Sequence, residues 1–503
     1  MKKSVGILSG LAVAIAVVTI AGAWYTGKQL PAELEQSIAR GNAELQKALV
    51  GTGGTMTIEL VSLDQHLFTS EAKYRLKARD LRLSQGEPVS FEVGVDDHIE
   101  HGPFPWSRVK TLKLLPVMAV SNSRLQKDDT TADWFAAAGD KTPVTGQVTL
   151  GYAGGVQSDI ALAPVKLDEG DGNLMDFGGM QLLLKGDKEG KSLDIHGEAP
   201  RLDMTLVGDD HPPIKLQANG FRIGGKLDST AHDMIYVGHL DLYLADLQAT
   251  LGPKQDVLLL KGLEQNSVYS AEGQDRVGGR LEYKVSDITY AGRQVGSGQM
   301  VMSMKSINMA AAQALADWYQ AKAPQMQAAA AQGQQGLPAL DMTPEEKAMV
   351  QTHLQKLLAD KPQFALEDLS FKTANGQSRF NMTMDFANPA SFDLPPDQLM
   401  KQLIARLQSK LTVSKAMVGD LTTLQALLDG QSDPQAIAQQ SSQAGEMLGV
   451  MALQSGMATV EGNDVVSSLN YADGMVELNG RKMPVEDFVM MMSAQLAVLS
   501  PQG

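Results

Sequence analysis

Cysteine is absent from this 503-residue sequence, and positive charge is in short supply. Without cysteine the chain can form no disulfide bond, thiolate zinc site, cysteine nucleophile or lipidated cysteine. The 43 Lys and Arg residues are outnumbered by 58 Asp and Glu residues, which gives a net charge of -15. Such a charge opposes nonspecific attraction to nucleic acid and to anionic lipid headgroups. We therefore expect no nucleic-acid partner, and packing alone must stabilise the fold.

Complete catalytic motifs are also missing, because H-E-x-x-H, G-x-S-x-G and G-x-G-x-x-G do not occur. Two S-x-x-K matches, Ser70–Lys73 and Ser107–Lys110, lack the S-D-N and K-T-G strings that an acyl enzyme of this type requires. The segment Gly186–Ser192 resembles a phosphate loop but is one residue short between its glycines, and a strand-like stretch follows it. It therefore predicts a hairpin turn. We expect no catalytic residue and no cofactor.

A cluster of polar side chains at Asp96–His101 places five potential metal ligands within six residues. On a strand, successive side chains alternate between faces, so His98 and His101 would point in opposite directions unless a turn at Gly102 rotates the second one. A metal site is therefore one interpretation, and a solvated strand end is the one that the spacing favours. We expect no metal.

The longest apolar run lies near the N-terminus, where Val5–Tyr25 has no charged residue and is preceded by two lysines. As a helix, these 21 residues would span roughly 30 Å, the thickness of the hydrocarbon core of a bilayer. The length favours a permanent anchor over a cleaved signal peptide, although cleavage after Ala23 is the alternative. Trp24 and Tyr25 would then lie at the membrane interface, with the rest of the chain outside the cytoplasm.

Periodicity along the remaining chain predicts an α+β fold. Apolar spacing from Pro31 indicates a helix that ends near Gly51. Between Val144 and Met304, strand-like segments recur about every ten residues with Gly, Asp and Pro between them. This pattern is typical of hairpins in a large, mostly antiparallel sheet. Its apolar face must be covered by curling, by a second sheet, by helices or by a ligand.

The last third of the sequence mixes helices with hairpins. Thr343 and Glu346 form a capping box that predicts a helix start, and Asn375–Gly376 predicts a hairpin turn. Leu399, Leu403 and Leu407 fall at helical spacing. We expect five regions: a transmembrane anchor (1–27), a helix with a first β region (28–143), a β-meander (144–309), an Ala- and Gln-rich helix and linker (310–342) and a helix-rich α+β region with hairpins (343–503).

The most specific string is "HGPFPW", formed by His101, Gly102, Pro103, Phe104, Pro105 and Trp106. Its prolines fix φ and bias the preceding residues toward extended backbone. The string therefore predicts a rigid corner that presents two aromatic side chains. One interpretation is a packed corner that braces the first sheet, and the other is a contact with a groove or partner.

Several strings resemble the YdgA-like family of Gram-negative bacterial proteins, namely "GAWYTGKQLPAELEQ", "LFTSEAKYRL", "HGPFPW" and the C-terminal "LNYADGMVELNGRKMP". The resemblance implies a periplasmic protein that is anchored in the inner membrane and self-associates, in a family without an assigned activity. It brings no catalytic residue with it.

We expect a non-enzymatic binding or structural protein of the envelope. In the specific version of this hypothesis, the apolar face of a curled sheet binds lipid or another apolar ligand. The partners would be the inner membrane, through the N-terminal helix, and further copies of the chain as a homodimer or higher homo-oligomer. The alternatives are a homo-oligomeric scaffold, supported by adaptable Met-rich helices that include Met490–Met492, and a periplasmic hydrolase.

Overall fold

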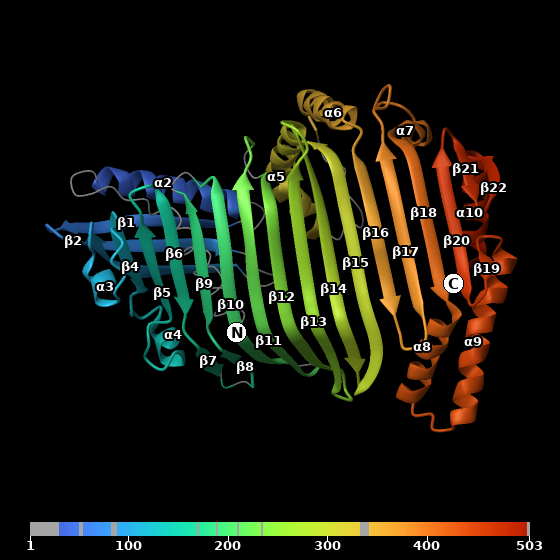
Figure 1. The fold of residues 1–503 in the computed structure, drawn as a ribbon, viewed down its shortest axis with the longest axis horizontal. Coiled ribbons are helices and arrows are strands. Elements are labelled where there is room, and N and C mark those ends of the chain that lie inside the picture. Colours follow the sequence, from blue (N-terminus) through green and yellow to red (C-terminus); the bar gives the residue numbers. More distant parts are fainter. Residues whose placement is uncertain are drawn as a thin grey trace. The chain divides into compact units, whose positions relative to one another are not determined.

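The computed structural model of this protein has two compact units, which are described separately below (Figure 1). The first comprises residues 1–245, 251–253 and 316–341, and the second comprises residues 246–250, 254–315 and 342–503. The structure describes residues 30–49, 54–81, 88–168, 170, 172–187, 190–208, 211–232, 235–331 and 342–499. Among these described residues, no helix is both long and apolar enough to cross a membrane. The predicted anchor, with Trp24 and Tyr25, lies outside the described residues.

In the first unit, an antiparallel meander follows a single helix, α2 (Leu30–Ala48). The paired strands are, in spatial order, β1 (Thr55–Gln65), β2 (Thr69–Leu81), β3 (Val89–His101), β4 (Ala119–Leu125), β5 (Val144–Leu150), β6 (Gly155–Leu162), β9 (Met180–Asp187), β10 (Ser192–Gly208) and β11 (His211–Ser229). The remaining elements are the hairpin of β7 (Val165–Asp168) and β8 (Leu174–Phe177), the latter paired with β10, and two short helices, α3 (Trp106–Lys110) and α4 (Ala132–Ala137).

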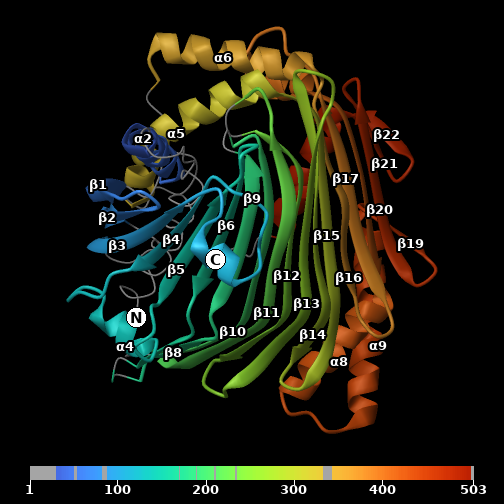
Figure 2. The same ribbon diagram turned by 60° about the vertical axis from the view of Figure 1, so that its left-hand side comes forward.

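The core of the first unit lies on one face of the sheet and extends from β1 to β9, and α2 covers its first strands (Figure 2). Leu34 and Leu45 of the helix are fully buried there against Met56 and Ile58 of β1. The amide of Asn42 fixes the helix to the strand, because it exchanges two hydrogen bonds with the backbone of Ile58. Alternate residues of β2 and β3 enter the same core, as their sequence alternation requires.

The strand β12 (Tyr236–Leu251) contains the boundary between the units, since its residues 246–250 belong to the second one. The second unit contains, in spatial order, the antiparallel strands β13 (Asp256–Ala271), β14 (Arg276–Tyr290), β15 (Arg293–Asn308), β16 (Gln363–Lys372), β17 (Gln377–Phe386), β18 (Ile404–Ser414), β20 (Asp464–Ala472), β21 (Met475–Leu478) and β22 (Arg481–Pro484), with β19 (Thr459–Glu461) also paired to β20. The helices of this half of the chain are α5 (Met309–Ala331), α6 (Pro344–Ala359), α7 (Pro396–Leu403), α8 (Lys415–Leu428), α9 (Pro434–Ser455) and α10 (Val485–Leu499).

The mostly antiparallel sheet and the local start and turn signals are confirmed. The capping box of Thr343 and Glu346 is formed at the start of α6. A tight turn joins β16 to β17 at Asn375–Gly376. On either side of the predicted hairpin turn, Gly186 pairs with Leu193, and the carboxylate of Asp187 accepts hydrogen bonds from the backbone N–H groups of Lys191 and Ser192.

Two details of the prediction were wrong. The helix predicted over Leu399–Leu407 ends at Leu403, because the chain pairs with β17 from Ile404 onward. Strand-like segments were predicted about every ten residues, but Ser192–Gly208 form one continuous strand of 17 residues, β10. Pro200 is tolerated inside this strand because it falls where β10 changes partners, from β9 (last pair Glu198 with Gln181) to β8 (first pair Leu202 with Phe177).

Candidate functional site

One face of the sheet in the second unit is apolar across four neighbouring strands. Met302 on β15 lies directly opposite Leu281 on β14 and Leu366 on β16, and Leu366 lies opposite Met382 on β17. Residues two positions away in each strand repeat this pattern, except that Leu369 follows Leu366 by three positions because the register shifts between them. We call the following set the apolar rows: Leu281, Tyr283, Met300, Met302, Met304, Phe364, Leu366, Leu369, Phe380, Met382 and Met384.

The apolar rows are not covered by a core. Phe364 and Leu369 are 42% and 44% exposed, and Met302 and Met382 are half-buried. No hydrophobic core cluster within the described part of the chain includes a residue of the rows. The helices of this unit lie toward the ends of these strands, with α6 at one end and α8 and α9 at the other (Figure 2). The rows thus leave an open apolar face roughly 14 Å in each direction, at the spacings of strands and residues in a sheet.

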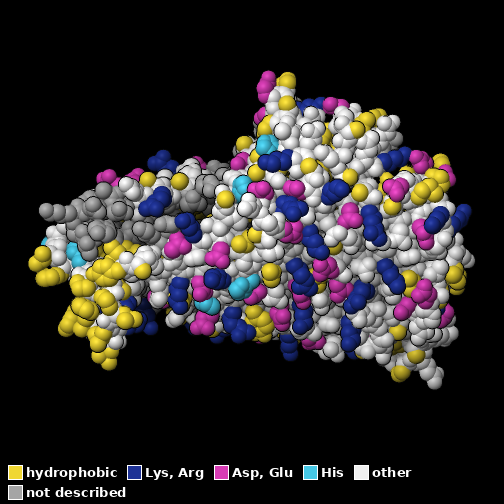
Figure 3. Space-filling model, turned by 45° about the horizontal axis from the view of Figure 1, so that its top comes forward, with side chains coloured by type: hydrophobic (Ala, Val, Ile, Leu, Met, Phe, Trp, Pro, Cys, Tyr) yellow, Lys and Arg dark blue, Asp and Glu magenta, His cyan; other side chains and the backbone are white. Residues whose placement is uncertain are grey.

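The opposite face of the same strands is charged. Arg280 precedes Leu281 on β14 and forms ion pairs with Glu282 at 2.8 Å and with Glu367 at 3.2 Å. Hydrogen bonds from Ser303 and Arg280 hold the pKa of Glu367 below its usual value. Acidic and basic side chains are interspersed over the sheet on this side (Figure 3). The sheet is therefore two-sided, with a solvated face and an open apolar face.

A separate apolar surface lies at one end of the first unit, where three segments expose large side chains. The segments are the turn between β1 and β2, the "HGPFPW" corner and the loop after α3. Hydrophobic side chains gather at this end, at the lower left of Figure 3. We call the following set, whose members are 58% to 83% exposed, the apolar tip: Leu67, Phe68, Phe104, Trp106, Leu112, Leu114 and Leu115.

His101 holds the segments of the apolar tip together. Its backbone N–H donates to the carbonyl of Phe68 at 2.8 Å, and its Nε2 lies 3.0 Å from the buried hydroxyl of Ser70. The loop returns to the corner through a hydrogen bond from the Val117 N–H to the Pro103 carbonyl. Gly102 has no room for a side chain, since an added Cβ would lie 1.9 Å from the carbonyl oxygen of Val117. These hydrogen bonds and the close approach at Gly102 define the path of the chain through the corner.

The packed interpretation of this corner does not hold for its aromatic residues. Phe104 is 58% exposed and Trp106 is 62% exposed, whereas Pro105 between them is buried. Phe104 lies in the bend before α3 and Trp106 is the first residue of that helix, so the chain turns between the two rings and both face solvent while Pro105 is buried.

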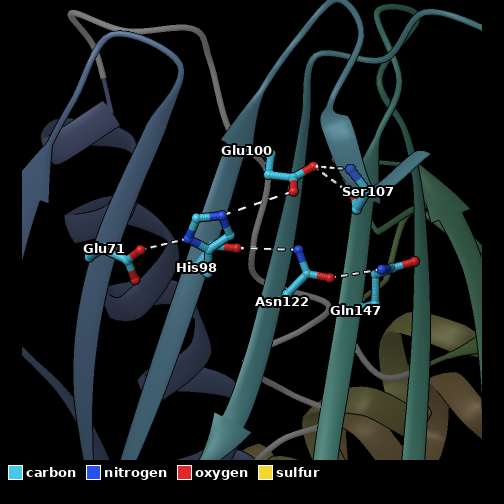
Figure 4. Close-up of polar contacts among 6 residues, drawn as sticks. All are labelled: Glu71, His98, Glu100, Ser107, Asn122 and Gln147. Carbon is cyan, nitrogen blue, oxygen red and sulfur yellow. Dashed lines mark hydrogen bonds and ion pairs between the residues drawn. The ribbon is translucent and has the colours of Figure 1, made fainter. Parts of the chain in front are cut away.

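A polar network supports the corner from the other face of the sheet (Figure 4). The Glu100 carboxylate accepts hydrogen bonds from the backbone N–H and the hydroxyl of Ser107, which fixes the start of α3. His98 lies between Glu71, at 2.6 Å, and Glu100, at 3.9 Å. Asn122 Nδ2 donates to the His98 carbonyl, at 3.4 Å, and so links the network to the next strand.

The polar cluster predicted at Asp96–His101 is split between two faces of β3. His98 faces Glu71, and His101 faces Ser70, the neighbouring residue of β2. No three His, Asp or Glu side chains among the described residues converge as metal ligands would. Ser70 and Lys73 also lie on opposite faces of β2, so this S-x-x-K match does not have helical geometry. Ser70 is fully buried.

Asp97 is a wholly buried carboxyl group in the core of the first unit. It accepts a hydrogen bond from Ser121 at 2.7 Å and lies 3.5 Å from the hydroxyl of Tyr74. Burial raises the pKa of Asp97 to about 6, and the hydrogen bonds offset part of this effect. Burial, together with the charge of Asp97, likewise raises the pKa of Tyr74.

A hollow of about 1160 Å³ in the first unit is lined mainly by polar side chains. Glu71, His98 and Arg124 border one part of it, and His196 and Arg222 border another. Ion-pairing side chains interrupt this lining, so it is not a continuous apolar surface. Among these surfaces, the apolar rows fit the sequence-based expectation of an apolar sheet face.

Sequence reasoning found part of each surface. The alternation of Phe380, Met382 and Met384 indicates one strand of the apolar rows, but the register that aligns it with β14 to β16 is not visible in a single strand. Leu112 and the two leucines that follow were missed in the loop after α3. The string "KTLKLLP" was the available signal, because it places three leucines within four residues of a short segment that ends at a proline.

The chain is similar to known bacterial proteins over nearly its whole length. A family model described as "Bacterial protein of unknown function (DUF945)" matches residues 1–486. Protein YdgA of Escherichia coli (strain K12) is 28% identical over 98% of this chain and 97% of its own length. The uncharacterized protein YihF of the same organism is 24% identical over 96% of this chain and 97% of its own length. No solved structure matches the chain. The chain therefore belongs to the YdgA-like family of bacterial proteins of unknown function.

Proposed function

We propose that this protein binds the acyl chain of a lipid, or a similar apolar ligand, on the apolar rows of the second unit. The observation that carries the proposal is the open face itself. Eleven apolar side chains on four strands are aligned in register, and no core covers them in the described structure. Exposed apolar patches of this kind on a folded protein mark binding surfaces.

The composition of the rows suits a chain-like ligand. Five of the eleven side chains are methionines, whose flexible thioethers adapt to ligands of different shape. Each methylene group removed from water against such a face contributes roughly 0.8 kcal/mol. A micromolar dissociation constant corresponds to about 8 kcal/mol, so roughly ten methylenes of an acyl chain would have to be buried against the face.

The proposed setting is the bacterial envelope. The charge-free run at residues 5–25 supports a single-pass inner-membrane anchor, and the two lysines before it support a cytoplasmic N-terminus. The bulk of the chain would then lie in the periplasm, next to membrane lipids. The protein would act there as a non-enzymatic binding protein in envelope maintenance.

Binding of a fluorescent fatty acid, cis-parinaric acid, tests the acyl-chain site. Met382→Glu places a carboxylate on the apolar rows, and we expect it to weaken binding about tenfold, because the ligand would bury that charge. Asn381→Glu is the matched control. Its side chain lies on the charged face of the same strand, opposite Lys410, so binding should stay within about twofold of the unmodified protein.

Both variants should keep the far-ultraviolet circular dichroism spectrum of the unmodified chain. Equal weakening by the two variants, or no saturable binding by the unmodified protein, would contradict the proposal. Lipid analysis of the purified protein gives an independent check, since we expect lipid to be retained and to be lost in Met382→Glu.

Self-association is a second candidate function, and the exposed face of α9 favours it. Met447, Val450 and Met451 have the i, i+3, i+4 spacing of one helix face, and each is more than half exposed. Light scattering of the protein in detergent measures the oligomer directly. Met447→Gln with Met451→Gln should reduce its mass if this face joins the copies.

A further inference from the structure

We propose that the apolar tip of the first unit inserts into the surface of a lipid bilayer that carries anionic headgroups. This inference concerns a different unit from the acyl-chain site and does not depend on it. The tip combines features of interfacial membrane contacts, namely exposed leucines and aromatic rings next to basic side chains.

The corner and the loop after α3 carry positive charge, unlike the chain as a whole. Residues 101–118 contain Arg108, Lys110 and Lys113 and no Asp or Glu, although the whole chain carries a net charge of -15. Lys110 Nζ lies 5.6 Å from the ring centre of Trp106, so a cation and an amphipathic ring are presented together. Tryptophan prefers the headgroup layer, and basic groups nearby would meet the lipid phosphates.

The direction of α2 places the start of this helix at the same end of the unit as the apolar tip. Asn42 bonds to Ile58 and Gln46 bonds to Met56, so the helix and β1 run in opposite directions. Leu30, the first residue of α2, is about 18 Å from Asn42 along the helix axis. This distance brings it close to the end of β1 that leads into the Leu67 turn.

The tip therefore lies at the end of the unit where the described chain begins. The charge-free run at residues 5–25 comes directly before this point in the sequence. A bilayer that holds this run would face the same end of the unit, which favours a membrane over a protein as the occupant of the tip.

The tip is also held firmly enough to insert without reorganising. His101 ties the Leu67 turn to the corner, the hydrogen bond from Val117 to Pro103 closes the loop, and Glu100 fixes the start of α3. A preformed apolar surface loses little conformational entropy on binding.

The absence of cysteine makes a site-specific test possible, because a single introduced cysteine can be labelled uniquely. The full chain is reconstituted into vesicles of phosphatidylethanolamine and phosphatidylglycerol that also contain lipids spin-labelled at known acyl depths. Leu112→Cys carries the environment-sensitive dye NBD on the tip. Asp129→Cys carries it on an exposed position beyond the other end of β4 and is the control.

We expect the spin-labelled lipids to quench the dye at position 112 roughly twofold or more and to leave the dye at position 129 unchanged. Replacing phosphatidylglycerol by phosphatidylcholine, or introducing Lys110→Gln with Lys113→Gln, should reduce this quenching. Circular dichroism of each labelled variant checks that the fold is retained.

Absence of quenching at position 112 would overturn the proposal. A dye signal that grows with the ratio of protein to lipid, without quenching, would also overturn it, because a second copy of the chain would then occupy the tip. Quenching that is independent of phosphatidylglycerol and of both lysines would overturn the assignment of anionic lipid. None of these outcomes bears on cis-parinaric acid binding, so failure of this inference is distinguishable from failure of the proposed function.

Discussion

Asp97 gives the first unit a stability that depends on pH. The side chain lies in the core of the first unit, with Ser121 and Tyr74 as its polar neighbours. Burial penalises the charged form, and the pKa therefore rises from an ordinary value of 3.8 to about 6 in the folded protein. The folded state thus binds a proton more tightly than the unfolded chain does.

The sign of the effect follows from this difference. Below about pH 4 the carboxyl group is neutral in both states and adds no pH dependence. Between about pH 4 and pH 6 the unfolded chain loses its proton first, so the free energy of unfolding falls as the pH rises. One pH unit of pKa difference corresponds to about 1.36 kcal/mol, so the loss is about 3 kcal/mol by pH 7.

Asp97→Asn removes the titration while keeping both polar contacts, because the amide accepts from Ser121 and donates to Tyr74. We expect the variant to match the unmodified protein near pH 4 and to exceed it by up to about 3 kcal/mol at pH 7. Urea unfolding followed by the fluorescence of Trp134, which is buried in the same core, measures this difference. Asp96→Asn is the matched control, since this neighbouring carboxylate lies on the other face of β3.

The reasoning is refuted if the difference between Asp97→Asn and the unmodified protein is the same at pH 4.5 and pH 7. It is also refuted if Asp96→Asn removes the pH dependence equally well. A deficit of Asp97→Asn that grows as the pH rises would show that the charged form of Asp97 is favoured in the core.

Two further predictions concern backbone positions. Gly102→Ala should lower the free energy of unfolding of the first unit by roughly 1 to 3 kcal/mol, because its Cβ meets the Val117 carbonyl; Gly155→Ala, which has open space, should be nearly neutral in the same urea assay. Thr343→Ala should remove the capping box of α6 at a cost of about 1 kcal/mol, and hydrogen exchange at residues 345–348 should speed up while exchange in α9 stays unchanged. Unchanged exchange in α6 would show that packing alone holds this helix end.

Local signals in the sequence predicted individual helices, strands and turns better than they predicted how the strands pair in the sheet. The capping box at Thr343, the turn at Asn375–Gly376 and the alternation in β17 act over a few residues, and each was visible in the sequence. Strand length was underestimated at Pro200, because a residue that normally ends a strand is harmless where the strand changes partners. That exchange of partners depends on residues far away in the chain.

The two candidate surfaces also depend on contacts between distant residues, which local sequence signals do not reveal. The apolar rows depend on the register of four strands that are separated by up to about a hundred positions, and a single strand cannot reveal that its neighbours carry apolar residues at the same level. The "HGPFPW" corner was found by its prolines, but the exposure of Phe104 depends on what packs nearby. Nothing in the string itself distinguishes a ring that packs inside from one that faces solvent.

The apolar rows also have a chemical weakness that follows from their composition. Met300, Met302 and Met304 on β15 and Met382 and Met384 on β17 are thioethers, and oxidants convert thioethers to polar sulfoxides. The change leaves the backbone pairing of the strands in place, because no main-chain group reacts. Oxidation would thus make this face of the sheet polar and hydrated without unfolding it. Reduction of the methionine sulfoxides would restore the apolar face.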